Sequence, residues 1–208
     1  MEKEKYIQDL ADIKNMMERS SRFISLSGAS GILAGTFALI GAYFAWTILY
    51  QFDAHFMRSF VTDLPKMVVI KLAVVAFSVL GLSLLSGMLL TQKRAKSQGR
   101  TIWDETAKRL VISLATPLVI GGVFLLILLS KGLAGIVAPG TLIFYGLALI
   151  NASKYTLTDI KVLGFSEIVV GLLATYFVGY GLFFWAFGFG VLHIIYGIWM
   201  YLKYEKAA

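Results

Sequence analysis

The chain contains five long stretches that have no charged residue. They are residues 23–52, 72–92, 110–130, 132–153 and 168–202. A helix needs about 20 apolar residues to cross the hydrocarbon core of a bilayer. The last stretch is too long for one span at about 1.5 Å per residue, so we divide it at the glycine-rich residues 179–181. The pattern predicts an all-α, multi-pass membrane protein.

We expect one membrane domain, a six-transmembrane-helix bundle over residues 23–208. An amphipathic helix is expected before it, over residues 1–22, on the cytoplasmic side. The chain has 208 residues, 58% of them hydrophobic, which leaves no room for a further soluble domain. The expected spans are residues 25–50, 67–90, 110–130, 141–154, 163–178 and 182–202.

The 19 Lys and Arg residues are distributed unevenly between the two ends of such a bundle. With six spans, all but Arg58, Lys66, Lys71 and Lys131 fall on one side. Cytoplasmic loops carry an excess of Lys and Arg, so we expect both termini in the cytoplasm and the bundle in a bacterial inner (plasma) membrane. The same loops account for the net charge of +7 through attraction to anionic lipid. The expected partners are the bilayer and either a second copy or another membrane protein, not nucleic acid.

Small residues recur every three or four positions in several expected spans. Such spacing lets helices approach closely within lipid, where no hydrophobic force drives them together. Gly31 and Gly35 form a GxxxG motif in the first span. The predicted helix-packing glycines are Gly28, Gly31, Gly35, Gly171, Gly190 and Gly197.

Two stretches that lie 42 residues apart are similar, residues 145–151 and 187–193, and Gly122 and Gly164 keep the same offset. Each stretch lies in the second helix of an expected hairpin, so the repeat would be parallel. It predicts three stacked helical hairpins. The alternative is that apolar, glycine-rich helices resemble one another by composition alone.

The glycine spacing of residues 165–171, 187–190 and 196–198 resembles the two-helix repeat of the HdeD-like acid-resistance membrane proteins. The resemblance is clearest over residues 164–202, and the first two spans match the repeat poorly. The whole chain also resembles other small six-span bacterial membrane proteins. The resemblance implies a plasma-membrane location and a role in stress tolerance, and it supplies no catalytic residues.

Polar side chains inside the expected spans are candidates for function, because burying them in a membrane is costly. Glu167 and His193 each share a helix face with small residues, so both should point into helix contacts. With Asn151 and Tyr196 they would form a polar cluster in the cytoplasmic half. At about 1.5 Å per residue, Glu167 lies about 5 Å and His193 about 13 Å from the inner boundary, which predicts no direct contact without a water or Tyr196 between them.

This cluster has two interpretations. In the first, each group makes one interhelical hydrogen bond worth about 0.6 kcal/mol. In the second, the cluster binds a proton or a small solute. The first leads to a non-enzymatic protein with a structural, stress-related or regulatory role, and the second to a transporter or channel.

Signals for enzymatic chemistry are weak. The chain has no cysteine, and its two histidines lie on different segments, so we expect no metal and no cofactor. The sequence Gly28-Ala29-Ser30-Gly31 spells GxSG, and with His193 it resembles the serine and last-helix histidine of rhomboid-type intramembrane proteases. That family's His/Asn oxyanion motif is absent, so an intramembrane serine hydrolase is only a remote alternative.

Overall fold

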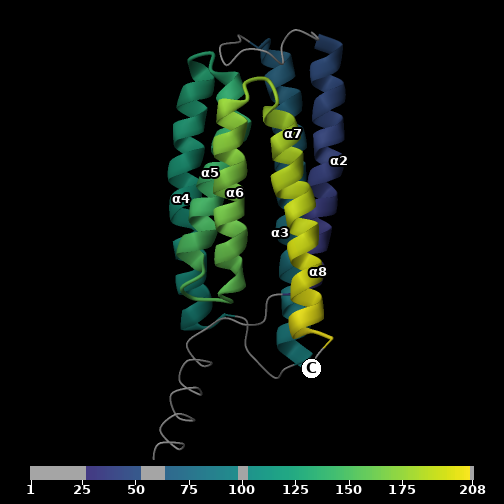
Figure 1. Ribbon diagram of the computed structural model, residues 1–208, viewed down its shortest axis with the longest axis vertical. Coiled ribbons are helices and arrows are strands. Elements are labelled where there is room, and N and C mark those ends of the chain that lie inside the picture. Colours follow the sequence, from purple (N-terminus) through teal and green to yellow (C-terminus); the bar gives the residue numbers. More distant parts are fainter. Residues whose placement is uncertain (1–26, 53–63, 98–102, 207–208) are drawn as a thin grey trace, which may run out of the picture.

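The computed structural model describes residues 27–52, 64–97 and 103–206 (Figure 1). The amphipathic helix expected over residues 1–22 lies outside this range. The described elements are helices that form an elongated bundle. Their bounds are α2 Gly28–Phe52, α3 Lys66–Ser97, α4 Glu105–Ser130, η2 Ala134–Ile136, α5 Val137–Ala152, α6 Asp159–Tyr176, α7 Gly181–Trp185, the π-helical segment η3 Ala186–Leu192, and α8 His193–Tyr204.

The surface of the bundle identifies the solvent around it. In the described part of the chain, five helices are long and apolar enough to cross a membrane: α2, α3, α4, α5 with η2, and the run from α7 through α8. Large apolar side chains along them are exposed, including Phe77, Ile112 and Leu126. Soluble monomers do not expose such contiguous apolar surface. The protein is therefore a multi-pass membrane protein.

The sixth helix, α6, is only 18 residues long, and its three charged residues, Asp159, Lys161 and Glu167, leave it no uncharged stretch as long as those of the other five. It ends at Tyr176, and α7 begins at Gly181 after a turn in which Gly179 adopts φ 94°. This left-handed conformation is readily available only to glycine. The turn confirms the predicted division of the long uncharged stretch. The described residues thus form a bundle of six helices, when the run from α7 through α8 is counted as one.

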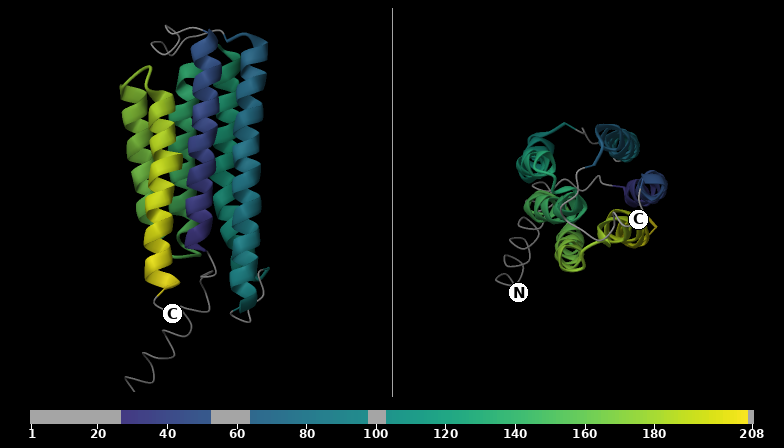
Figure 2. Two further views of the ribbon diagram at one scale, coloured as in Figure 1. Left: turned by 90° about the vertical axis from the view of Figure 1, so that its right-hand side faces the viewer. Right: turned by 90° about the horizontal axis from the view of Figure 1, so that it is seen from above.

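Seen from above, the helices form a ring in the order α4, α5, α6, α8, α2, α3 (Figure 2). The most extensive contacts join α5 to α6 and α2 to the run from η3 to α8. Helix α6 packs less extensively on α7 and η3. The bundle therefore contains two well-packed antiparallel pairs, α5 with α6 and α2 with α8, that meet along a weaker interface. Helix α4 packs on α5 of the first pair, and α3 packs on α2 of the second.

The two pairs use the same packing in atomic detail. A Cβ atom added at Gly146 of α5 would lie 2.5 Å from the Gly164 oxygen and 2.7 Å from Ile168 Cγ1. A Cβ atom added at Gly35 of α2 would lie at the same two distances from the Gly190 oxygen and Ile194 Cγ1. Helix α5 thus corresponds to α2, and α6 to α8. Because α6 and α8 run in opposite directions, the correspondence is inverted.

The glycine contacts do not follow the predicted parallel repeat of residues 145–151 and 187–193. Gly146 faces the backbone of Gly164, whereas Gly188 faces the side chains of Glu167 and Leu142. Of the three predicted hairpins, α2 with α3 and α4 with α5 pack extensively, whereas in the third α6 packs mainly on α5 and α8 mainly on α2. The reason is that rows of glycines, here called glycine seams, let the backbone of α8 contact that of α2 and the backbone of α6 contact that of α5. Among the described residues, the short turn between α6 and α7 brings no such backbone contact.

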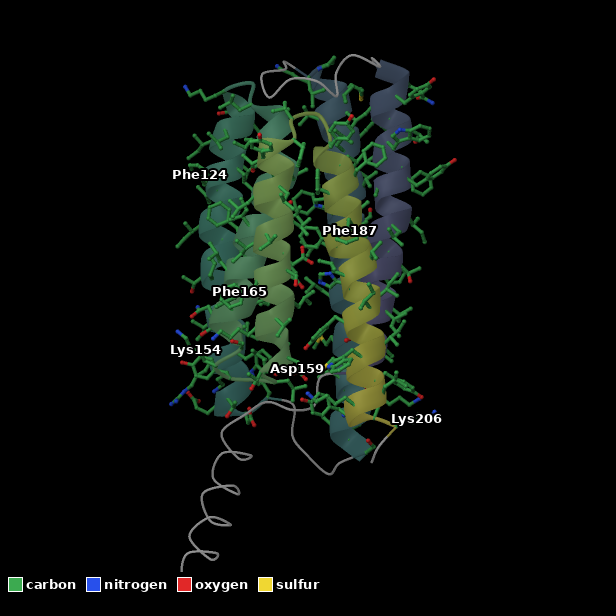
Figure 3. All side chains as sticks on the ribbon, viewed as in Figure 1. Phe124, Lys154, Asp159, Phe165, Phe187 and Lys206 are labelled. Carbon is green, nitrogen blue, oxygen red and sulfur yellow. The ribbon has the colours of Figure 1, made fainter. Side chains whose placement is uncertain are left out.

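Ionic contacts gather at the end of the bundle that contains the C-terminus. Lys203 Nζ lies 2.7 Å from Asp159 Oδ2, and the Tyr204 hydroxyl donates to the same oxygen at 2.8 Å. Partial burial opposes ionisation of Asp159, but the hydrogen bonds from Lys203 and Tyr204 outweigh it and lower the pKa of this carboxyl. The labelled Lys154, Asp159 and Lys206 all lie toward this end (Figure 3).

A second contact at the same end ties three helices together. Arg94 of α3 donates to Glu205 Oε1 at 2.9 Å and to the Tyr204 carbonyl at 3.0 Å. The backbone N–H of Gly28, the first residue of α2, donates to the same Glu205 oxygen. The first N–H groups of a helix have no partner within the helix, so Glu205 caps α2 while it pairs with Arg94.

Candidate functional site

A buried polar cluster lies at the interface between the two helix pairs. His193 Nδ1 of α8 lies 3.3 Å from Glu167 Oε1 of α6, and His193 Nε2 lies 2.8 Å from the Tyr145 hydroxyl of α5. Glu167 is completely buried, and His193 is 7% exposed. Glu167 follows Gly164 by three residues, as His193 follows Gly190, so the two groups occupy corresponding positions in the two pairs.

The π-helical segment shapes the histidine side of the cluster. It spans Ala186–Leu192, directly before His193, and the Gly188 carbonyl lies 3.1 Å from His193 Nδ1. A π-helical turn is wider than an α-helical turn, and such turns are frequent at functional sites. Gly188 also makes room for the carboxyl, because a Cβ atom there would lie 2.5 Å from Glu167 Oε2.

These contacts assign the hydrogens of the imidazole ring. A carbonyl oxygen only accepts hydrogen bonds, so Nδ1 of His193 carries a hydrogen and donates to Gly188. In the neutral ring Nε2 is then bare and accepts from the Tyr145 hydroxyl. A second proton on Nε2 reverses this bond, because Tyr145 must then accept. Protonation of the ring therefore changes the hydrogen bond between His193 and Tyr145 of α5.

Glu167 is held in apolar surroundings without full hydrogen bonding. Among the described residues, neither of its carboxyl oxygens has a hydrogen-bond partner. Leu142, Val170 and Ala174 form a buried apolar cluster nearby, and Leu142 and Glu167 lie against the same glycine. An ionised carboxyl in such a site is costly unless it is paired, and the only adjacent cation-forming group in the described part of the chain is His193.

The prediction that Glu167 and His193 do not touch directly is wrong. The prediction measured the depth of each residue from the expected end of its own span, and those two ends do not lie at the same depth in the bundle. The contact of Asp159 in α6 with Lys203 in α8 shows which residues of the two helices do lie at the same depth. From that level Glu167 is about 12 Å and His193 about 15 Å along the helix at about 1.5 Å per residue. The two side chains span the remaining difference, and Tyr196 does not lie between them.

The other two residues of the expected cluster direct their polar groups away from Glu167 and His193. Asn151, near the end of α5, donates to the Ser113 carbonyl at 2.8 Å and accepts from Lys154. Tyr196 packs with Tyr145 against one group of buried apolar residues, and its buried hydroxyl has no hydrogen-bond partner among the described residues. Tyr145 takes the place that the sequence interpretation gave to these two. An uncharged tyrosine inside an apolar span gives no signal of its own.

The predicted packing glycines line the two seams. Gly28, Gly31 and Gly35 of α2 face the backbone of α8 and η3 around Gly190 and Gly197. The sixth of them, Gly171 of α6, faces Pro139 and Ile143 of α5.

The groups considered for hydrolysis make other contacts. The Ser30 hydroxyl donates to the Ser27 carbonyl in its own first turn. His193 turns both ring nitrogens to α5, α6 and its own helix. A nucleophile needs its base within hydrogen-bond reach, and the described contacts give Ser30 none. Nor do any three His, Cys, Asp or Glu residues in the described ranges gather as metal ligands.

Comparison of the chain with known protein families, with curated proteins and with solved structures finds no match.

Proposed function

We propose that this membrane protein moves protons, alone or together with a small solute, by exchange at the cluster of Glu167, His193 and Tyr145. The observation that carries the proposal is the 3.3 Å approach of a completely buried carboxyl to a buried imidazole. Ionisable groups inside membrane helices mark proton and ion pathways in many pumps and transporters. The pair holds one proton in two ways, as two neutral groups or as carboxylate and imidazolium.

The arrangement of the helices supports the same proposal. Secondary transporters are commonly built from inverted repeats, with the coupling site at the repeat interface. Here two inverted helix pairs meet at Glu167 and His193, and each pair is packed more tightly than the interface between them. Rocking of one pair against the other would expose the cluster first to one side and then to the other.

Proton flux into proteoliposomes tests the proposal. The protein is reconstituted around a trapped pH-sensitive dye, and a potassium diffusion potential drives proton entry. We expect the wild type to carry protons faster than empty liposomes, and Glu167→Gln and His193→Ala to reduce the rate at least about tenfold. Tyr196→Phe is the matched control, because it alters a buried tyrosine outside the cluster. Flux that is equal in all four proteins would refute the proposal.

A structural or stress-related role is the second candidate. The close glycine seams favour it, since they build a tightly packed bundle without any bound group, and the resemblance to HdeD-like proteins points the same way. Under this hypothesis the wild type carries no protons, but loss of the protein lowers bacterial survival at acid pH. The hypothesis is abandoned if survival depends on Glu167.

We further propose that the charged end of the bundle faces the cytoplasm of a bacterium. Described Lys and Arg residues gather at that end, whereas the opposite end carries Lys66, Lys71 and Lys131. The positive-inside rule then orients the bundle. The absence of cysteine allows a clean test with single cysteines at Lys131 and Lys206. An impermeant thiol reagent added to whole cells should label only Lys131→Cys, and the reverse result would overturn the orientation.

A further inference from the structure

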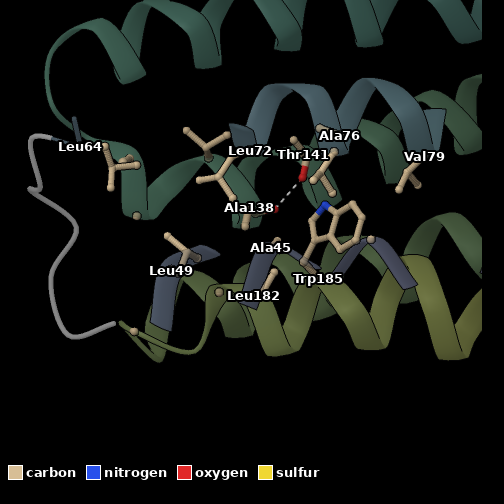
Figure 4. A pocket seen from close by; sticks show the side chains of 17 residues that line it. Ala45, Leu49, Leu64, Leu72, Ala76, Val79, Ala138, Thr141, Leu182 and Trp185 are labelled. Carbon is tan, nitrogen blue, oxygen red and sulfur yellow. Dashed lines mark hydrogen bonds between the residues drawn. The ribbon is translucent and has the colours of Figure 1, made fainter. Parts of the chain in front are cut away.

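An apolar cavity of about 240 Å³ lies between α2, α3, α5 and α7, at the end of the bundle opposite the C-terminus. Ala45, Ala76 and Leu182 are among its lining residues (Figure 4). None of the lining residues in the described ranges is charged. An engineered apolar cavity of about 150 Å³ in another protein binds benzene, so this one has room for a somewhat larger molecule of about ten non-hydrogen atoms.

Two side chains give the cavity a polar point. Trp185 and Thr141 both line it, and Figure 4 shows the indole nitrogen on the side of Thr141. The Thr141 hydroxyl donates its hydrogen to the Ala138 carbonyl. The indole N–H of Trp185 has no hydrogen-bond acceptor among the described residues. Trp185 is half-buried, and a tryptophan that faces an apolar pocket usually pairs this donor. The partly open cavity therefore presents one donor that no acceptor of the described residues fills.

We propose that this cavity binds a small neutral molecule, whose apolar body fills the space and whose single hydrogen-bond acceptor meets the Trp185 N–H. Pockets of this kind obtain affinity from apolar contact and orientation from a few placed polar groups. A charged ligand is disfavoured, because no lining side chain among the described residues would balance its charge on leaving water.

The site is separate from the proton cluster but close to it. Trp185 packs on Phe189 at 5.0 Å between ring centroids, and Phe189 packs on His193 at 5.9 Å. Thr141 and Tyr145 lie one turn apart on α5. Binding in the cavity does not depend on proton exchange, so Glu167→Gln should bind the ligand as the wild type does. This separates a failure of the binding proposal from a failure of the proposed function.

Three fluorinated probes of matched size test the proposal by ¹⁹F NMR line broadening in lipid nanodiscs, with empty nanodiscs subtracted. They are 4-fluoroacetophenone, which carries an acceptor, 4-fluorocumene, which carries none, and 4-fluorobenzoate, which is charged. We expect saturable binding of the ketone, about three- to tenfold weaker binding of the hydrocarbon, as expected for one neutral hydrogen bond, and no binding of the benzoate.

Variants locate the site. Ala76→Phe should abolish ketone binding, because Ala76 lines the cavity, whereas Val74→Phe on the lipid-exposed face of the same helix should not. Trp185→Phe should weaken the ketone three- to tenfold and leave the hydrocarbon unchanged. The proposal is overturned if the wild type shows no saturable binding, as expected for a cavity filled by lipid tails. It is also overturned if Ala76→Phe binds normally, or if the ketone has no advantage over the hydrocarbon.

Discussion

The seam between α2 and α8 gives a sharp prediction, because its glycines differ in how much room they have. A Cβ atom at Gly35 would lie 2.5 Å from the Gly190 oxygen and 3.0 Å from the Ile194 nitrogen, both backbone atoms. A Cβ atom at Gly31 would lie 3.1 Å from the Gly197 Cα atom. Gly35→Ala therefore requires the two helices to separate, whereas Gly31→Ala needs a shift of only a few tenths of an ångström.

The expected magnitude combines two opposing terms. Overpacking of a close contact costs about 1–3 kcal/mol, whereas replacing glycine by alanine inside a helix gains about 0.5–1 kcal/mol. Gly35→Ala should therefore lower the free energy of unfolding by about 1–2 kcal/mol, and Gly31→Ala by less. Gly81→Ala and Gly122→Ala are the controls, because nothing lies within 4 Å of a Cβ atom at either position. Both should be neutral or slightly stabilising.

The assay is reversible unfolding by sodium dodecyl sulfate in mixed micelles, followed by helix content. The inverted correspondence adds a stricter requirement, because a Cβ atom at Gly146 meets the same three kinds of atom at the same distances as one at Gly35. Gly146→Ala should thus cost as much as Gly35→Ala. The reasoning is refuted if Gly146→Ala is neutral, or if Gly81→Ala is as destabilising as Gly35→Ala.

Three further predictions concern the polar contacts. Gly188→Ala should displace the Glu167 carboxyl, because the new Cβ would lie 2.5 Å from Glu167 Oε2. It should reduce proton flux in the liposome assay while the helix content stays unchanged. Glu205→Gln should lower the free energy of unfolding by about 1–3 kcal/mol, because the partly buried Arg94 loses its ionic partner. Asp159→Asn should cost less than about 1 kcal/mol, since its ion pair is partly exposed to solvent at the end of the bundle. The pKa of Asp159 is lower in the folded state than in the unfolded state. The stability difference between the wild type and Asp159→Asn should therefore be full above the unfolded pKa of about 4, and it should disappear as the pH falls through the lower folded pKa.

The membrane spans could be predicted from the sequence because the absence of charge directly reflects the lipid environment. The ends of the helices could not, because a helix continues beyond the hydrocarbon core. Helix α3 runs to Ser97, through Lys93 and Lys96, although its apolar run ends near residue 90. For the same reason hydropathy misplaced Glu167 relative to His193. Their register is set by packing and by the contact of Asp159 with Lys203.

The inverted correspondence did leave a signal in the sequence. Residues 164–171 read GxxEIxxG, and residues 190–197 read GxxHIxxG, an offset of 26 residues. The similarity at an offset of 42 residues obscured it, because that comparison matched glycines with different neighbours. Tyr145 could not be found in this way, because its contact with His193 depends on how α5 lies against α8.

Because Glu167 and His193 occupy corresponding positions, exchanging them tests whether the pair acts as a unit. Glu167→His alone would bring two imidazoles together, and His193→Glu alone would bring two buried carboxyls together, which cannot both ionise. Exchanging both restores one acid and one base at the two positions whose wild-type side chains lie 3.3 Å apart. The double variant should be more stable than the sum of the two single effects predicts, with a coupling of about 0.5–3 kcal/mol. If the stability effects of the two single variants are strictly additive, Glu167 and His193 do not interact. Proton exchange between the two helix pairs would then have no physical basis.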